Sequence, residues 1–274
     1  AMADCQTLAE SYSMDAETYY LTGCVALAMD SYDEASSNFT EAYGEDATYD
    51  RAIQIYEAYL EKDMEADGTR YLEAALKTEA KNAEDYCNRG KVYYYMEDYS
   101  NAQKELTEAV NQKSTEGMLL LGMVYRAQGD TSNARSMYQQ YVSADDSDPA
   151  KGYNGLALCD MDDGSYDSAL ENISKGLEDA STEEMQDLLF NEIVVYEKKL
   201  DFATALSKMQ EYIKMFPDDE NAAKELTFLQ SRNGELSNDT ASDTTENTDA
   251  EAASDAGDTT DTSDGSDESG EEEY

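Results

Sequence analysis

One short stretch of the sequence has the composition of a calcium-binding loop. Residues 159–171 read CDMDDGSYDSALE, in which Asp160, Asp162 and Glu171 take the first, third and twelfth places around a glycine. Carboxylates at these places are the ligands that hold Ca²⁺ in a twelve-residue loop. Such a loop also needs glycine at its sixth place, where the chain turns sharply, and here the sixth residue is Ser165. We therefore predict a tight turn between two helices rather than a calcium site.

The sequence offers few residue types for metal or acid–base chemistry. It contains no histidine, which removes the commonest metal ligand and the commonest general base. No phosphate-binding loop, dinucleotide-binding glycine motif or nucleophile elbow occurs in it. The four cysteines are widely spaced, without the CxxC pairs of a zinc site, and lie at Cys5, Cys24, Cys87 and Cys159. We predict small buried or groove-facing thiols, no metal ion, no cofactor and no enzymatic activity.

Acidic residues outnumber basic ones by a wide margin. The 274 residues include 62 Asp and Glu against 19 Lys and Arg, which gives a formal net charge of −43. A chain with this charge repels nucleic-acid phosphates and anionic lipid head groups. In addition, no apolar run approaches the ~20 residues that a membrane-spanning helix needs. We expect no nucleic-acid binding and no membrane span in this chain, and a cationic or amphipathic protein or peptide is favoured as the partner.

The stretch at 159–171 is one of several similar segments. In each segment a small residue follows a polar turn, an apolar residue comes four places later, and a further small or aromatic residue comes three after that. This i, i+4, i+7 spacing places each set on one face of a helix. Successive sets are separated by 32 to 36 residues, and they begin at Ala35, Gly68, Ala102, Ala134, Ala169 and Ala205. A partner helix precedes each turn, and glycines at Gly23, Gly90 and Gly122 let the two helices cross closely.

A helix–turn–helix unit of about 34 residues is the period of the tetratricopeptide repeat. The sequence resembles that family from its N-terminus to about residue 232, and its most specific copies contain GKVYYYMEDYSNAQKELTEAV and LGMVYRAQGDTSNARSMYQQYV. The resemblance implies an all-α solenoid of about six repeats. They occupy residues 16–48, 49–82, 83–114, 115–149, 150–185 and 186–218. The copy at 49–82 departs most from the pattern, because Gly68 replaces the usual alanine.

Three further segments flank these repeats. Residues 1–15 carry the apolar spacing of a second helix, so we predict a partial N-terminal repeat whose first helix lies upstream of this sequence. Residues 219–232 alternate apolar and charged positions and predict a capping helix. Residues 233–274 hold 15 of the 62 acidic residues and no Lys or Arg. That segment cannot bury enough surface to offset the entropy lost on ordering, so we predict a disordered acidic tail.

Stacks of this family present a concave groove to peptides or helices. The resemblance places groove-facing side chains at the second, fifth, ninth and twelfth positions of each first helix. It implies a peptide-binding set made up of Tyr20, Ile53, Lys91, Tyr94, Leu119, Met123, Arg126, Asn154, Leu158 and Phe190. As an alternative, some of these residues are buried against a neighbouring helix. The Lys, Asn and Arg set with which one branch of the family holds a chaperone's C-terminal carboxylate is absent here.

The sequence thus predicts a non-catalytic scaffold or adaptor that binds a protein or peptide in the concave groove of a tetratricopeptide-repeat solenoid. The acidic body, the absence of Lys and Arg before Arg51 and an extended tail favour the exported face of a bacterial membrane, with a lipid anchor upstream of this sequence. One alternative is an accessory module of a longer or cytoplasmic complex, truncated here. An enzyme is a more remote alternative.

Overall fold

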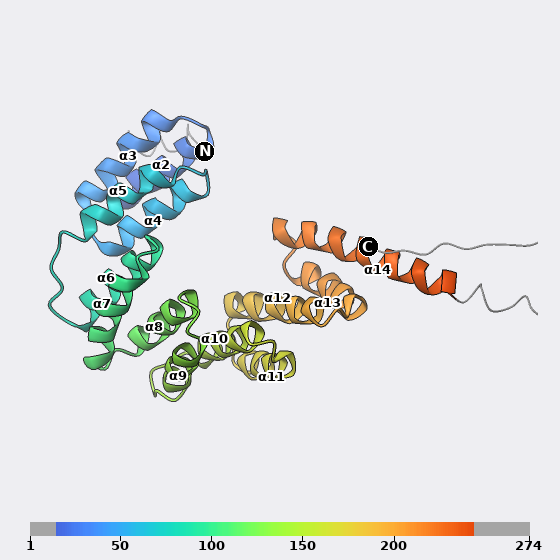
Figure 1. The fold of residues 1–274 in the computed structure, drawn as a ribbon. Coiled ribbons are helices and arrows are strands. Elements are labelled where there is room, and N and C mark those ends of the chain that lie inside the picture. The colour runs from blue at the N-terminus through green and yellow to red at the C-terminus, as the bar shows by residue number, and fades with distance from the viewer. Residues whose placement is uncertain (1–14, 244–274) are drawn as a thin grey trace, which may run out of the picture.

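The computed structural model describes residues 15–243, and all of their regular elements are helices (Figure 1). Six helix pairs follow one another along the chain. They are α2 (Ala16–Ala28) with α3 (Tyr32–Glu45), α4 (Tyr49–Leu60) with α5 (Glu65–Ala75), α6 (Ala83–Tyr95) with α7 (Tyr99–Asn111), α8 (Thr115–Ala127) with α9 (Thr131–Val142), α10 (Pro149–Asp162) with α11 (Tyr166–Gly176), and α12 (Thr182–Lys198) with α13 (Phe202–Met215). A last helix, α14 (Glu220–Asp243), packs on α13. The predicted all-α solenoid of about six repeats is confirmed.

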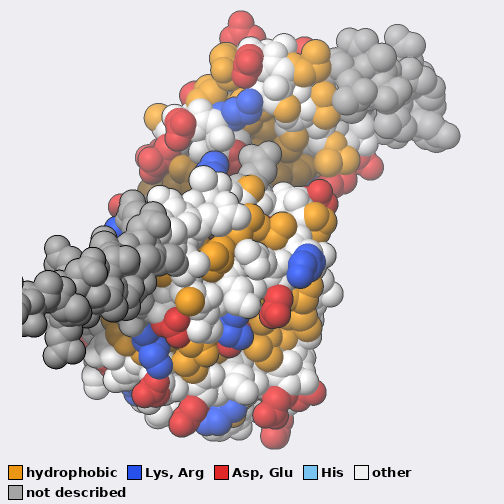
Figure 2. All heavy atoms as spheres, turned by 90° about the vertical axis from the view of Figure 1, so that its right-hand side faces the viewer, with side chains coloured by type: hydrophobic (Ala, Val, Ile, Leu, Met, Phe, Trp, Pro, Cys, Tyr) orange, Lys and Arg blue, Asp and Glu red, His pale blue; other side chains and the backbone are white. Residues whose placement is uncertain are grey.

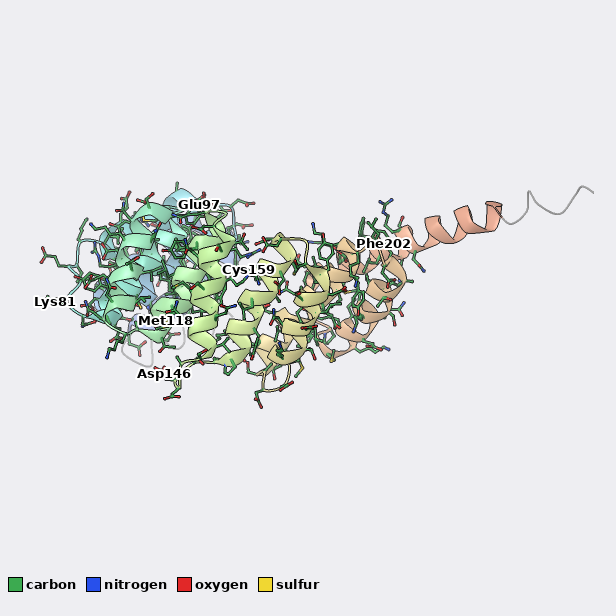
Figure 3. The ribbon with its side chains drawn as sticks, turned by 60° about the horizontal axis from the view of Figure 1, so that its bottom comes forward. Lys81, Glu97, Met118, Asp146, Cys159 and Phe202 are labelled. Carbon is green, nitrogen blue, oxygen red and sulfur yellow. The ribbon has the colours of Figure 1, made fainter. Side chains whose placement is uncertain are left out.

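The pairs stack into a curved arc. In Figure 1 the chain runs from α2 at the upper left, through α8 to α11 at the bottom, to α13 at the right. The first helices of successive pairs contact one another, from α4 to α6, α8, α10 and α12. In the lower part of the arc α8 and α10 lie on the inner side, whereas α9 and α11 lie on the outer side (Figure 1). Figure 3 shows these helices side by side in a second view. The row of first helices therefore forms the inner surface.

The repeating positions found in the sequence form the core. Each small residue after a turn is buried, and so are the residues four and seven places later. The residues four places later have exposed fractions of 2 % or less, and they are Phe39, Leu72, Leu106, Tyr138, Ile173 and Met209. Burying a side chain of this size contributes roughly 1.5–3 kcal/mol, and the neighbouring helix pair supplies part of the surface that covers it. The stability of each repeat thus depends on its neighbours.

Glycine allows the closest helix crossings within a pair. A methyl group at Gly23 would lie 2.6 Å from Cε1 of Phe39, and one at Gly90 would lie 2.4 Å from Cγ of Leu106. Both distances are far below ordinary carbon–carbon contact. The backbone of the first helix therefore lies directly against a buried side chain of the second helix, as the spacing of these glycines predicts.

The stretch that resembles a calcium loop is the predicted turn between α10 and α11. Gly164 lies in this turn with φ at +72°, in the left-handed region where glycine pays no steric cost. Gly129 takes the same place between α8 and α9 with φ at +77°. In the other four pairs a residue with a side chain adopts this conformation, and these residues are Asp30, Asp63, Glu97 and Leu200. One left-handed residue thus reverses the chain in every pair.

Several carboxylates of this stretch are paired with neighbouring side chains. Asp160 is 4 % exposed and accepts hydrogen bonds from Nη1 of Arg135 at 2.6 Å and from Nδ2 of Asn172 at 2.7 Å. Arg135 also donates to Asp163 at 2.8 Å, which joins α9 to the end of α10. Within residues 15–243 no cluster of three or more potential metal-ligating side chains occurs. These acidic groups hold adjacent helices together.

The two ends of the chain differ in how far the structure describes them. Residues 1–14 and 244–274 lie outside the described residues, so the partial N-terminal repeat and most of the acidic tail stay predictions. The last helix does not end at Arg232 but continues to Asp243, so the predicted boundary at 232 is too early. Helical hydrogen bonds are local, and an established helix can extend beyond its packed segment. None of the described helices combines the length and the apolar character needed to cross a membrane.

Candidate functional site

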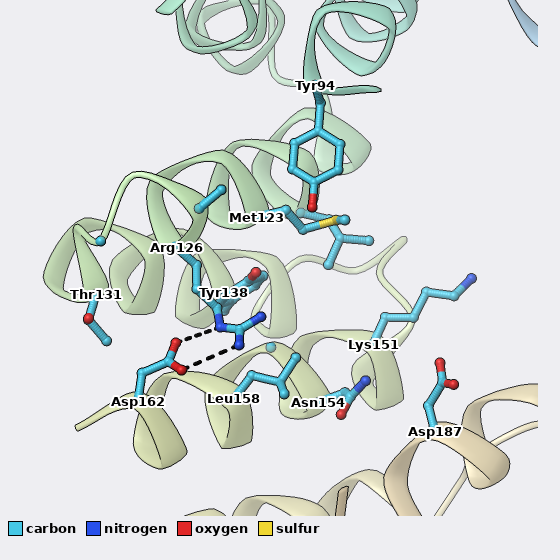
Figure 4. A pocket seen from close by; sticks show the side chains of 14 residues that line it. Tyr94, Met123, Arg126, Thr131, Tyr138, Lys151, Asn154, Leu158, Asp162 and Asp187 are labelled. Atoms are coloured by element: carbon cyan, nitrogen blue, oxygen red, sulfur yellow. Dashed lines mark hydrogen bonds and ion pairs between the residues drawn. The ribbon is translucent and has the colours of Figure 1, made fainter. Parts of the chain in front are cut away.

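A cavity of about 620 Å³ opens on the inner surface, where α8 and α10 lie between α6 and α12 (Figure 4). Its walls are mainly apolar: α8 contributes Leu119 and Met123, and α10 contributes Leu158. Tyr94 points from α6 toward Met123 across the opening (Figure 4). Figure 2, which views the molecule from the right-hand side of Figure 1, shows hydrophobic side chains exposed between charged ones. The cavity has the size and composition of a ligand site.

Tyr138 forms part of the cavity wall although it belongs to the second helix of its pair. Its side chain is 2 % exposed, and its ring lies against the backbones of both α8 and α10. A Cβ atom at Gly122 would be 2.7 Å from Cε1 of this ring, and one at Gly155 would be 2.5 Å from the same atom. Burial raises the pKa of Tyr138 above its ordinary value, so its hydroxyl stays neutral. The two glycines let this ring reach the inner surface.

The cations that line this cavity already have partners. Arg126 donates from Nε to Asp162 at 2.6 Å and from Nη2 to the same carboxylate at 3.4 Å, which links α8 to α10. Nζ of Lys151 lies 3.5 Å from Oε1 of Glu184 and 3.7 Å from Oδ2 of Asp148. The interior of the cavity is therefore apolar, and the two cations at its edge are compensated.

A second cavity of about 390 Å³ adjoins the first one along α12. The two cavities share Asn154, Leu158 and Asp187. The rest of its lining combines two aromatic rings with amide and carboxylate groups, from Gln186, Phe190, Asn191, Tyr212, Asp219 and Asn221. Nδ2 of Asn191 donates a hydrogen bond of 2.7 Å to Oδ1 of Asn154. The second cavity is more polar than the first, so the two together offer different environments to adjacent groups of one ligand.

Asp219 in the second cavity is held in its charged form. The hydroxyl of Tyr212 donates to it at 2.6 Å, and the backbone N–H groups of Asn221 and Ala222 donate at 3.0 and 3.1 Å. These hydrogen bonds, that of Tyr212 first, lower the pKa of Asp219 below its ordinary value. Asp219 thus caps the start of α14 and adds a negative charge to the cavity.

Most of the predicted groove residues meet at this place. The first cavity is lined by Tyr94, Leu119, Met123, Arg126, Asn154 and Leu158. Phe190 lines the second cavity beside Asn154 and Leu158. The third to sixth helix pairs thus bring together seven of the ten predicted residues.

The other three predicted residues lie elsewhere. Ile53 is 3 % exposed and belongs to the core of the first two pairs. The ring of Tyr20 packs on Phe39, with 5.9 Å between centroids, and below the guanidinium of Arg51. Lys91 is half-buried on α6. Burial against a neighbouring helix, the alternative left open by the sequence, therefore fits Ile53 and Tyr20 better than a place in an open groove.

The cavities are also lined by residues that were not among those predicted, including Lys151, Asp187 and Tyr138. Lys151 and Asp187 stand at the second positions of the predicted repeats 150–185 and 186–218, so the positional rule already identifies them. Tyr138 had no such signal, because its spacing assigns it to the core face of a second helix. Only the glycine backbones of α8 and α10 expose its ring to the cavity.

The described cysteines are structural. Cys87 and Cys159 are buried and Cys24 is half-buried, as predicted. Burial raises the pKa of Cys159, which Figure 3 labels on α10, to about 11. The thiolate is the reactive form of cysteine, so Cys159 is unreactive near neutral pH.

The repeats match a family model in sequence and known proteins in structure. The sequence model of the tetratricopeptide repeat matches residues 87–149, from α6 to the start of α10. No curated protein matches the chain in sequence. A solved tetratricopeptide repeat protein from Parabacteroides merdae ATCC 43184 is similar in structure, with a TM-score of 0.60 and 16% identity over 84% of this chain and 91% of that one.

Two larger solved structures are also similar in fold. The human IFIT1 dimer with PPP-AAAA gives a TM-score of 0.51 and 17% identity over 85% of this chain and 64% of that one. The APC/C hetero-tetramer Cut9-Hcn1 gives a TM-score of 0.50 and 16% identity over 83% of this chain and 45% of that one. The present chain spans less than two thirds of either protein. At these identities the likeness concerns the fold alone.

Proposed function

Because the chain is a tetratricopeptide-repeat protein, we propose that it is a non-catalytic scaffold or adaptor that binds a protein or peptide on the inner surface of the stack. The observation that carries this proposal is the cavity of about 620 Å³ lined from four successive first helices, α6, α8, α10 and α12. Solenoid stacks use such concave surfaces for binding. A mainly apolar pocket with a few polar groups suits the recognition of a partner's side chain.

The side chains of the cavity support an adaptable protein interface. Met123 has a flexible, polarisable side chain, and Tyr94 presents an aromatic face together with a hydroxyl group. The formal net charge of −43 favours association with a cationic or amphipathic partner. We propose a partner of this kind.

For location we propose the exported face of a bacterial membrane. The support is the acidic composition and the absence of Lys and Arg before Arg51. Fractionation of the source cells checks it: recovery of the chain in the cytoplasmic fraction would favour the alternative of an accessory module in a cytoplasmic complex.

The binding proposal is tested by affinity capture from the source cells with three baits. The first bait is the full chain, and the second carries Tyr94→Ala, Leu119→Ala and Met123→Ala. The third is a matched control that changes three exposed residues of second helices, Thr107→Ala, Gln139→Ala and Glu171→Ala. We expect the first and third baits to retain the same partner and the second to lose it, with equal helix content by circular dichroism. Equal capture by all three folded baits, or capture by none, contradicts the proposal.

A further inference from the structure

The second cavity carries negative charge that no described cation neutralises. Its lining contains Asp187 and Asp219 and neither Lys nor Arg. Asp219 is committed to the start of α14, as described above. Asp187 forms no hydrogen bond or ion pair with the residues that the structure describes. Partial burial, followed by the nearby charges of Glu183 and Glu184, raises the pKa of Asp187 above its ordinary value. A carboxylate in such surroundings is stabilised by an added cation.

The first cavity is more apolar. The charges of Arg126 and Lys151 at its edge are compensated by neighbouring carboxylates, and its interior is formed by Leu119, Met123 and Leu158. Asp187 lines it where it borders the second cavity, so a ligand group that enters the interior mainly exchanges water for apolar contact. Burying one large apolar side chain there contributes roughly 1.5–3 kcal/mol before the costs of association.

Asn154 and Asn191 stand where the two cavities meet. Because Asn191 donates to Oδ1 of Asn154, the amide NH₂ of Asn154 and Oδ1 of Asn191 remain available to a ligand. One donor and one acceptor side by side match the C=O and N–H groups of a peptide backbone. This pair could hold a chain that passes from one cavity to the other.

The spacing of the cavities limits which side chains can occupy them together. They share three lining residues, so they lie next to each other on the inner surface. In an extended chain each residue advances about 3.3 Å and alternate side chains point to the same side. Two side chains two positions apart along an extended partner can therefore enter both cavities at once.

We propose that the two cavities bind one extended segment of the partner, in which a large aliphatic or aromatic side chain fills the first and a Lys or Arg side chain two positions away enters the second and pairs with Asp187. The inference rests on the proposed function and adds the chemistry of the recognised segment. It also gives a basis for rejection, because an acidic residue at the second place would meet Asp187 and Asp219 as like charges.

Selection from a phage-displayed library of random heptapeptides on the immobilised full chain tests the inference. We expect enriched sequences to share an aliphatic or aromatic residue with a Lys or Arg two positions before or after it. An enriched peptide is then synthesised with a fluorescent label, and its Kd is measured by anisotropy for the wild type, Asp187→Asn and the charge-matched control Asp33→Asn. Asp33 is exposed on α3 and remote from both cavities.

Asp187→Asn should raise the Kd of the peptide by about fivefold or more, whereas Asp33→Asn should leave the Kd unchanged within about twofold. Leu158→Ala should weaken it as well, because this residue lines both cavities. Enriched peptides without a basic residue, or a Kd unaffected by Asp187→Asn, would overturn the inference. So would the absence of any enrichment. In all of these cases the proposed function stands if affinity capture still yields a partner that depends on Tyr94, Leu119 and Met123, so the two failures are distinguishable.

Discussion

Replacing Gly155 by alanine tests whether close packing of α9 on α10 shapes the inner surface. The added methyl group would lie 2.5 Å from Cε1 and 2.6 Å from Cδ1 of Tyr138. Ordinary van der Waals contact begins near 3.4 Å, so the ring or the helix must move by roughly 1 Å. The ring has little freedom to move, because it is 2 % exposed and lies equally close to the backbone at Gly122.

The expected magnitude follows from two opposing effects. Overpacking of this kind costs about 1–3 kcal/mol, and a rigid ring at this distance belongs in the upper part of that range. Alanine in place of glycine within a helix recovers up to about 1 kcal/mol. The net change is a loss of roughly 1–2 kcal/mol in the free energy of unfolding. For a chain of this length that lowers Tm by about 3–6 °C.

Circular dichroism at 222 nm during heating measures the change, with Gly44→Ala as the control. Gly44 is exposed in α3 and has no neighbouring atom within 4 Å of an added Cβ, so this variant should keep or raise Tm. The two Gly→Ala changes are therefore expected to have opposite signs. A Gly155→Ala chain that melts at or above the wild-type temperature would refute the packing of Tyr138 between α8 and α10, and with it the origin of the cavity wall.

Three further changes address charge and turn geometry. Arg135→Met leaves Asp160, which is 4 % exposed, without its cation. It should lower the free energy of unfolding, measured in urea, by about 3 kcal/mol. The control Lys199→Met breaks a pair whose Asp167 side chain is 91 % exposed and should cost less than about 1 kcal/mol; equal losses would contradict the structural role of the Arg135 pair. Leu200→Gly should raise stability by about 0.5–1 kcal/mol, because φ at this exposed residue is +60°; a lower Tm would contradict it. Burial, and after it the charge of Glu225, raises the pKa of Glu197 from 4.5 to about 7. Between pH 4.5 and pH 7, Glu197 is therefore protonated in the folded chain but ionised in the unfolded chain. The protonated form of Glu197 favours folding fully below pH 4.5, and this contribution to the free energy of unfolding is lost as the pH rises to 7. Glu197→Gln should remove this dependence and be more stable than the wild type above pH 7, as measured by urea unfolding at several pH values; parallel pH profiles would refute the assignment.

The sequence by itself determined the architecture, because the signals that define it are local. Small residues such as Ala102 and Ala134 recur once per helix pair, and the residues four and seven places later fall on the same helix face. A helix face that is too wide to be buried alone requires a neighbouring repeat, so the period also predicts the stack. The glycine placement in the turn at Gly164 likewise separates an inter-helix turn from a calcium loop without structural information.

The tertiary structure decided what the inner surface is like. The relative rotation of successive pairs determines which groove positions converge, and it brings Leu119, Met123 and Leu158 together while leaving Ile53 in the core. It also decides which charges are compensated. Arg126 forms an ion pair with Asp162 on α10, whereas Asp187 forms none with the described residues. These contacts join residues from different repeats, and the separations involved depend on small rotations between helix pairs that a periodic sequence pattern does not specify.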